Sequence, residues 1–100
     1  MNSYRQILYH IVFCTSKRKN TLPVEHHKIL FKYIGDIVKK RNCILFRING
    51  TENHIHILSD LHPSITLSDY IKEIKTASNR WMEVSGCFPD FSSWRKDTAH

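Results

Sequence analysis

Hydrophobic residues recur along the chain at two different periods, which predict strands and helices. Residues 4–15 and 43–49 are rich in β-branched and aromatic side chains, as is typical of β-strands. Residues 24–41, and those between Thr66 and Gly86, place apolar side chains three and four positions apart, which predicts amphipathic helices. A third strand is predicted directly before His62-Pro63, where isoleucines alternate with histidines.

Local signals mark where these elements start and stop. Thr66 followed by Asp69 forms a capping box, and Gly86 suits the left-handed end of a helix. Residues 50–53 form a tight turn, so the second and third strands are expected to pair as a hairpin.

The distribution of apolar residues within the first two strands predicts their surroundings. Residues 4–15 carry apolar side chains on both faces, which favours a central position in the sheet. In the second strand Ile44, Phe46 and Ile48 fall on one face by simple alternation.

The order of elements predicts the fold class. Strand, helix, strand, strand, helix is the split βαβ, ferredoxin-like plan of an α+β protein. We expect one domain over residues 1–100, with an antiparallel sheet and both helices on one of its faces. Residues 92–100 could begin a fourth strand, so the last strand is expected to be incomplete.

Two histidines on the third strand are the strongest candidates for chemistry. His54 and His56 share one face of a strand, while Ile55 and Ile57 occupy the other. Neighbouring imidazoles can hold one divalent metal ion, although a merely polar outer face is the simpler alternative. Two ligands leave the coordination incomplete, so a third ligand and water are needed. His10 could face the same side, but a hydrogen-bonded structural role is the simpler interpretation.

The excess of positive charge points to a polyanionic partner. The formal net charge is +6 and the pI is about 9.4, which favours nucleic acid or an acidic membrane surface. A solvated loop and a solvated helix face are the plainer explanations for the same charges. The candidate DNA contacts are Lys17, Arg18 and Lys19 in a loop, and Lys72, Lys75 and Asn79 on one side of the second helix.

Cysteine usage and hydropathy predict a cytoplasmic protein. The three cysteines are odd in number and form no C-x-x-C pair, so reduced thiols are expected. No apolar run approaches the ~18 residues of a membrane span, and the first residues lack the apolar core of a signal peptide. We therefore expect a native start and no membrane partner.

Four segments resemble the single-tyrosine HUH transposases of bacterial insertion sequences, a group that includes the REP-associated tyrosine transposases. The motif Asn-His-Ile-His-Ile-Leu is similar to the His-hydrophobe-His motif of that family. The matching segments are 53–58, 9–15, 67–75 with 78–81, and the aromatic pair Phe91 and Trp94.

The resemblance implies a reaction and a set of partners. Such enzymes act as homodimers on single-stranded or hairpin DNA, and their two HUH histidines bind Mg²⁺ or Mn²⁺. By this resemblance His54 and His56 are the metal ligands. A tyrosine on a helix after the final strand attacks the phosphate and forms a 5′-phosphotyrosine link for strand transfer. A polar residue on that same helix completes the metal site.

The end of the sequence departs from the family pattern. The chain stops before the expected nucleophile helix, and Tyr4, Tyr9, Tyr33 and Tyr70 do not match the catalytic tyrosine. Only Tyr70 is a conceivable substitute, so we expect a truncated, catalytically incomplete transposase. Two alternatives stay open: a non-catalytic nucleic-acid-binding module on the same fold, and a small metal-binding or dimerisation protein without a DNA role.

Overall fold

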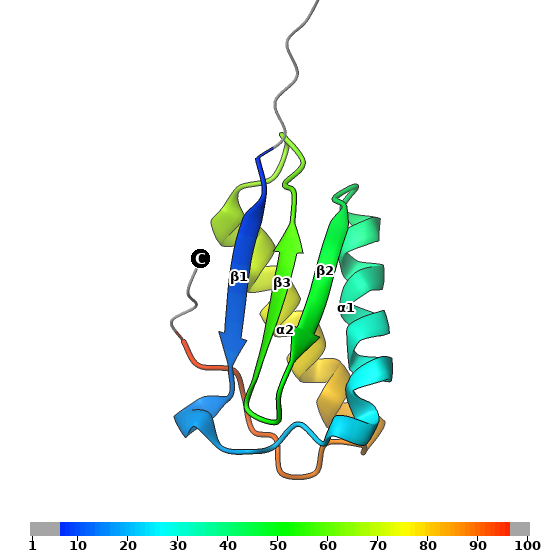
Figure 1. The fold of residues 1–100 in the computed structure, drawn as a ribbon, viewed down its shortest axis with the longest axis vertical. Coiled ribbons are helices and arrows are strands. Elements are labelled where there is room, and N and C mark those ends of the chain that lie inside the picture. The colour runs from blue at the N-terminus through cyan, green and yellow to red at the C-terminus, as the bar shows by residue number, and fades with distance from the viewer. Residues whose placement is uncertain (1–6, 97–100) are drawn as a thin grey trace, which may run out of the picture.

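The elements follow the predicted order in the computed structural model, which describes residues 7–96 (Figure 1). Their bounds are β1 Tyr9–Cys14, α1 His27–Lys40, β2 Leu45–Gly50, β3 His54–Ser59 and α2 Leu67–Ser85. Two short 3₁₀ turns, Ser16–Arg18 and Val24–His26, lie between β1 and α1. The expected α+β, ferredoxin-like arrangement is therefore confirmed.

The central strand of the sheet is β3. It pairs antiparallel with β1 on one side and with β2 on the other. The prediction of a central first strand is wrong for the described residues, because a single bridge between Thr15 and Trp94 is all that continues the sheet beyond β1. Apolar residues on both faces of β1 indicate that both faces are partly covered. They do not indicate whether a strand pairs with each of its two edges.

A β-bulge interrupts the pairing of β2 with β3. Leu45 pairs with Ser59, but Arg47 pairs with Leu58, so the register shifts by one residue between them. The prediction that Ile44, Phe46 and Ile48 share a face is therefore wrong. Ile48 packs against the core, whereas Ile44 and Phe46 are 53% and 45% exposed. The extra residue of the bulge reverses the alternation that a regular strand would keep.

Both helices cover one face of the sheet and leave the other face open (Figure 1). The strand residues that face the helices are fully buried, and α1 and α2 contribute the apolar stripes that contact them. Burial of such side chains is worth roughly 1.5–3 kcal/mol each and fixes the orientation of the strands. The core includes Ile11, Phe13, Leu30, Ile34, Val38, Ile55, Ile57, Tyr70, Ile74 and Met82.

The predicted signals at the two ends of α2 are confirmed. The Thr66 Oγ1 accepts a hydrogen bond of 3.1 Å from the Asp69 amide, and Gly86 adopts φ +75°. A side chain at Gly86 would be strained by this positive φ, even though no neighbouring atom lies within 4 Å of the place that a Cβ would occupy. α2 therefore begins and ends where the sequence predicts.

The segment after α2 returns to the edge of the sheet. Trp94 is buried, and its indole N–H donates to the Ser78 Oγ at 2.9 Å. The predicted fourth strand is represented by the bridge at Trp94, and residues 97–100 lie outside the described residues. Among residues 7–96, neither helix has the length and apolar character needed to cross a bilayer.

Candidate functional site

The open face of β3 carries His54 and His56. Their neighbours in sequence, Ile55 and Ile57, are fully buried on the helix side, while both histidines are half-buried. The two ring centroids are 6.3 Å apart and the ring planes differ by 27°, so the two imidazole planes are nearly parallel. A central strand anchored by two buried isoleucines holds this pair in a stable geometry.

Hydrogen bonds orient the His54 ring. Its Nδ1 lies 2.9 Å from the Asn53 Oδ1 and 3.0 Å from the Thr51 Oγ1. An Nδ1–H that donates to the Asn53 Oδ1 leaves Nε2 as the unprotonated nitrogen, and no residue of the described chain bonds to that Nε2. This is the outer hydrogen bonding that metal-ligating histidines use.

The His56 ring contacts a third histidine from β1. The His10 Nε2 lies 3.4 Å from the His56 Nδ1, and the two rings meet edge to face. The pKa of His56 is lowered by desolvation first and then by the positive charges of His10, His54 and Arg47. A lowered pKa keeps the imidazole neutral, which is the form that binds a metal ion.

The donor set fits two ligands of an open metal site. Within residues 7–96, no three His, Cys, Asp or Glu side chains gather closely enough to hold one ion. His10 therefore contacts His56 without completing a three-residue set. The remaining positions of such an ion would fall to water, to a substrate oxygen or to groups outside this set.

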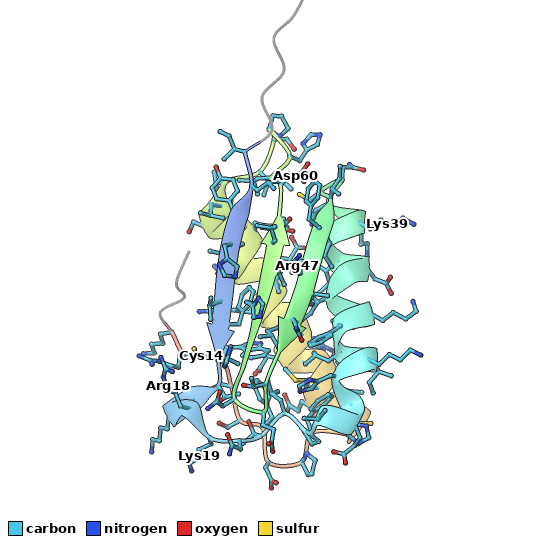
Figure 2. All side chains as sticks on the ribbon, in the orientation of Figure 1. Cys14, Arg18, Lys19, Lys39, Arg47 and Asp60 are labelled. Atoms are coloured by element: carbon cyan, nitrogen blue, oxygen red, sulfur yellow. The ribbon has the colours of Figure 1, made fainter. Side chains whose placement is uncertain are left out.

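The basic loop lies at the His54 end of β3. The Thr15 Oγ1 donates to the Lys19 carbonyl at 2.7 Å and to the Asn53 carbonyl at 3.1 Å. Arg18 and Lys19 are exposed below the end of β1 (Figure 2). Lys17 and Arg18 adopt φ values of 56° and 51°, an uncommon conformation for residues other than glycine. The structure thus brings the predicted contacts Lys17, Arg18 and Lys19 to the same end of the sheet as His54.

The predicted contacts on α2 lie on a different surface. The Lys75 Nζ donates to the carbonyls of Arg95 and Lys96 at 2.7 and 2.9 Å. Lys75 and Asn79 line a groove of about 780 Å³ between α2 and residues 93–96, and the Asn79 Oδ1 is buried without a partner among the described residues. Because α2 covers the helix face of the sheet, Lys72, Lys75 and Asn79 are not brought together with the histidines.

The three described tyrosines are packed into or against the core. Tyr70 is 1% exposed, its hydroxyl lies 2.8 Å from the Ser59 Oγ, and burial raises its pKa. Tyr33 stacks on Trp81 with ring centroids 4.7 Å apart. Tyr9 packs against the core, and Tyr4 lies outside the described residues. None of the described three is presented on the open face for attack on a phosphate.

The family assignment comes from comparison with known proteins. Residues 3–96 match the family described as "Transposase IS200 like". The chain belongs to the IS200-like transposase family. Over 80 residues, or 80% of its length, this IS200-like chain is 28% identical to the ISDra2 transposase TnpA of Deinococcus radiodurans, and it spans only 57% of that relative. The family expected from the four matching segments is confirmed.

Two solved structures share the fold of this IS200-like chain. A crystal structure of a protein assigned as a transposase, from Deinococcus radiodurans R1, superposes with a TM-score of 0.85 at 22% identity and covers 99% of this chain and 83% of that one. The REP-associated tyrosine transposase, solved bound to a REP hairpin, gives a TM-score of 0.66 at 15% identity, with 99% and 60% covered.

Reasoning from sequence alone misses two residues around the histidine pair of this IS200-like chain, Asn53 and Phe46. The sequence places Asn53 only in a turn, although its position directly before His54 is a usable signal for an orienting residue. The outward position of Phe46 is hidden by the assumption of regular alternation, which places it on the core face with Ile48 and which the bulge breaks.

Proposed function

We propose that this chain binds single-stranded or hairpin DNA and holds a divalent ion, Mg²⁺ or Mn²⁺, with His54 and His56. The observation that carries the proposal is the pair of imidazoles with nearly parallel ring planes on an uncovered sheet face, with the His54 Nδ1 in contact with Asn53 and Thr51. Membership of a transposase family makes a DNA phosphodiester the natural substrate of such a pair.

The residues around the histidines have distinct tasks in this proposal. Thr51 and Asn53 hold the His54 ring, and the basic loop at Lys17, Arg18 and Lys19 binds phosphates that flank the scissile bond. When bound, the ion would withdraw charge from a phosphate and stabilise the leaving oxygen. The reaction expected from the family is cleavage and strand transfer through a 5′-phosphotyrosine.

We infer that Tyr9, Tyr33 and Tyr70 do not supply the nucleophile, because all three pack into or against the core. Tyr70 in particular is buried, and its raised pKa disfavours the phenolate. In this proposal the attacking hydroxyl therefore comes from outside residues 7–96, and these residues by themselves bind DNA without cleaving it. A binding module without catalysis remains the second candidate, supported by the same packed tyrosines.

The nature of the DNA partner is supported by charge and by one relative. The net charge of +6 favours a polyanion, and the REP-associated tyrosine transposase was solved on a REP hairpin. Lys72, Lys75 and Asn79 stay predictions as DNA contacts on a separate surface. Lys75 is the weakest candidate for a DNA contact among these three residues, because its ammonium group already donates to two backbone carbonyls.

Assembly and compartment are further parts of the proposal. A homodimer is expected, and exposed apolar side chains such as Ile7 and Ile44 are available near the ends of the two edge strands. Sedimentation of the purified chain as a monomer at all concentrations would exclude the dimer. A cytoplasmic location suits the three free cysteines Cys14, Cys43 and Cys87.

The test measures metal and DNA binding on the same variants. Mn²⁺ binding by the purified chain, followed by titration calorimetry, should be lost in His54→Ala and His56→Ala. The matched control is His62→Ala, because His62 lies beyond the far end of β3 and bonds Ser64. Equal Mn²⁺ binding by all four proteins would remove the histidine pair as the site. Absence of hairpin DNA binding at low salt would remove the DNA proposal.

A further inference from the structure

Two consecutive residues of β2, Phe46 and Arg47, turn away from the core. Their neighbours Leu45 and Ile48 pack against the core, whereas Phe46 and Arg47 are both exposed. The bulge explains the pattern, since one extra residue lets two successive side chains lie on the same side of the strand. The open face therefore presents an aromatic ring beside a guanidinium.

The charge of Arg47 is not neutralised within the described structure. No hydrogen bond or ion pair joins its guanidinium to another residue in the range 7–96. β1, β2 and β3 contain no aspartate or glutamate, so the sheet face offers no carboxylate of its own. A free guanidinium on a face without carboxylates is complementary to an anionic ligand.

Arg47 also lies next to the histidine pair. It pairs with Leu58, which is two residues along β3 from His56 on the same face. Diagonal neighbours on a sheet are about 7–8 Å apart, within reach of a long side chain. The positive charge of Arg47 acts on the His56 imidazole, and Figure 2 shows Arg47 over the sheet rather than at its rim.

Phe46 adds an apolar surface at the same place. Its ring is 45% exposed, and Ile44, two residues before it, is 53% exposed. An aromatic ring beside a cation is the combination that binds single-stranded nucleic acid, because the ring stacks on a base while the cation contacts the backbone. The side chains of this pair thus match the two chemical parts of one nucleotide.

We propose that Phe46 and Arg47 form a nucleotide subsite next to His54 and His56. The guanidinium binds a backbone phosphate of a single strand, and the Phe46 ring stacks on a base attached to it. This subsite rests on the proposed function, since it requires the DNA strand to cross the open face. It extends that function by setting the path of the strand from the histidines toward the edge strand β2.

The test compares matched pairs of variants for binding of a fluorescent single-stranded oligonucleotide across a salt series. Arg47→Ala should weaken binding about threefold to tenfold at low salt and reduce the slope of log K against log salt by about 0.7, the value for one lost phosphate contact. Lys39→Ala is the control, because Lys39 is an exposed cation at the end of α1, on the other layer (Figure 2). Arg47→Lys should keep the slope.

The proposed stacking of a base on Phe46 is tested with an abasic oligonucleotide, which keeps the phosphates and lacks the bases. Phe46→Ala should weaken binding of the normal strand about fivefold or more and should leave binding of an abasic strand unchanged. Ile29→Ala is the control, because Ile29 is 41% exposed on α1. Circular dichroism of every variant separates loss of a contact from loss of the fold.

The outcomes distinguish the subsite from the proposed function. Wild-type protein that binds no single strand at low salt overturns both. Wild-type binding with equal losses in the Arg47→Ala and Lys39→Ala variants overturns the subsite alone. Phe46→Ala that abolishes self-association and leaves DNA binding unchanged assigns the surface to a second copy of the chain, which also overturns the subsite.

Discussion

The open face of the sheet and the outer side of α2 both carry basic side chains, but these side chains have different partners. On α2, Lys75 bonds the carbonyls of Arg95 and Lys96 and so anchors the segment that follows the helix. On the open face, Arg47 has no hydrogen-bond or ion-pair partner among residues 7–96, and the Nε2 of His54 has no hydrogen-bond partner among them either. The cation on α2 therefore stabilises the fold, whereas the cation on the open face is available to a ligand.

A cationic side chain indicates an anionic ligand only when no group of the folded chain already bonds it. Lys75 and Trp94 stabilise the return of the chain to the sheet edge, since the Trp94 indole donates to Ser78 at the centre of α2. The histidine pair is instead held by a buried anchor and a hydrogen-bonded turn.

The largest expected effect comes from the anchor beneath the histidines. Ile57→Ala removes a fully buried side chain and should lower the free energy of unfolding by about 2–5 kcal/mol. Leu58→Ala, on the open side of the same strand, should cost less than about 1.5 kcal/mol because Leu58 is only half-buried. Urea denaturation of the two variants checks this, and equal losses would contradict the two-sided description of β3.

The next largest effect should come from the residue that orients His54. Asn53→Ala removes the oxygen that faces the His54 Nδ1, and we expect Mn²⁺ affinity to fall about 10- to 100-fold. Asn49→Ala is the control, because Asn49 pairs with His56 across the sheet and its Oδ1 bonds the Gly50 amide instead of a histidine ring. Calorimetric titration should separate the two variants by at least about tenfold.

A smaller effect is expected on the α2 side. Trp94→Phe removes the indole N–H bond to the Ser78 Oγ and should lower the free energy of unfolding by about 1–2 kcal/mol. Mn²⁺ affinity should stay unchanged, because Trp94 packs on the helix side. A fall in Mn²⁺ affinity in this variant, with its fold intact, would show that the two surfaces are coupled.

The smallest effect is the dependence of stability on pH through His56. The folded chain holds the pKa of His56 below its unfolded value of 6.5, so the unfolded chain takes up a proton first as the pH falls. The contribution is fully present above pH 6.5 and is lost as the pH falls through the lower, folded pKa. Metal-free denaturation at several pH values should show a flatter profile for His56→Gln than for the wild type. A wild-type profile as flat as that of the variant would contradict this assignment.

Much of the fold was predictable because local patterns specify it. The Thr66 cap and the Gly86 stop depend on neighbours within a few residues, and both are confirmed. The outward position of Phe46 was not predictable, because a bulge depends on how β2 pairs with β3 and leaves no signal in a single strand. The prediction that β1 is a central strand was wrong for a related reason, because apolar residues on both faces of a strand do not show which strands pair with it.

The amino-acid pattern alone was enough to predict the order of the elements and to place His54 and His56 on the same side of their strand. β3 pairs with β1 in a regular register, so alternation along it places both histidines on one side. Tertiary packing was needed to bring His10 to His56 across 46 positions, to place the Asn53 amide against the Arg18 carbonyl, and to bond Lys75 to backbone carbonyls. These contacts depend on sheet register and chain return, which are set by packing between segments distant in sequence.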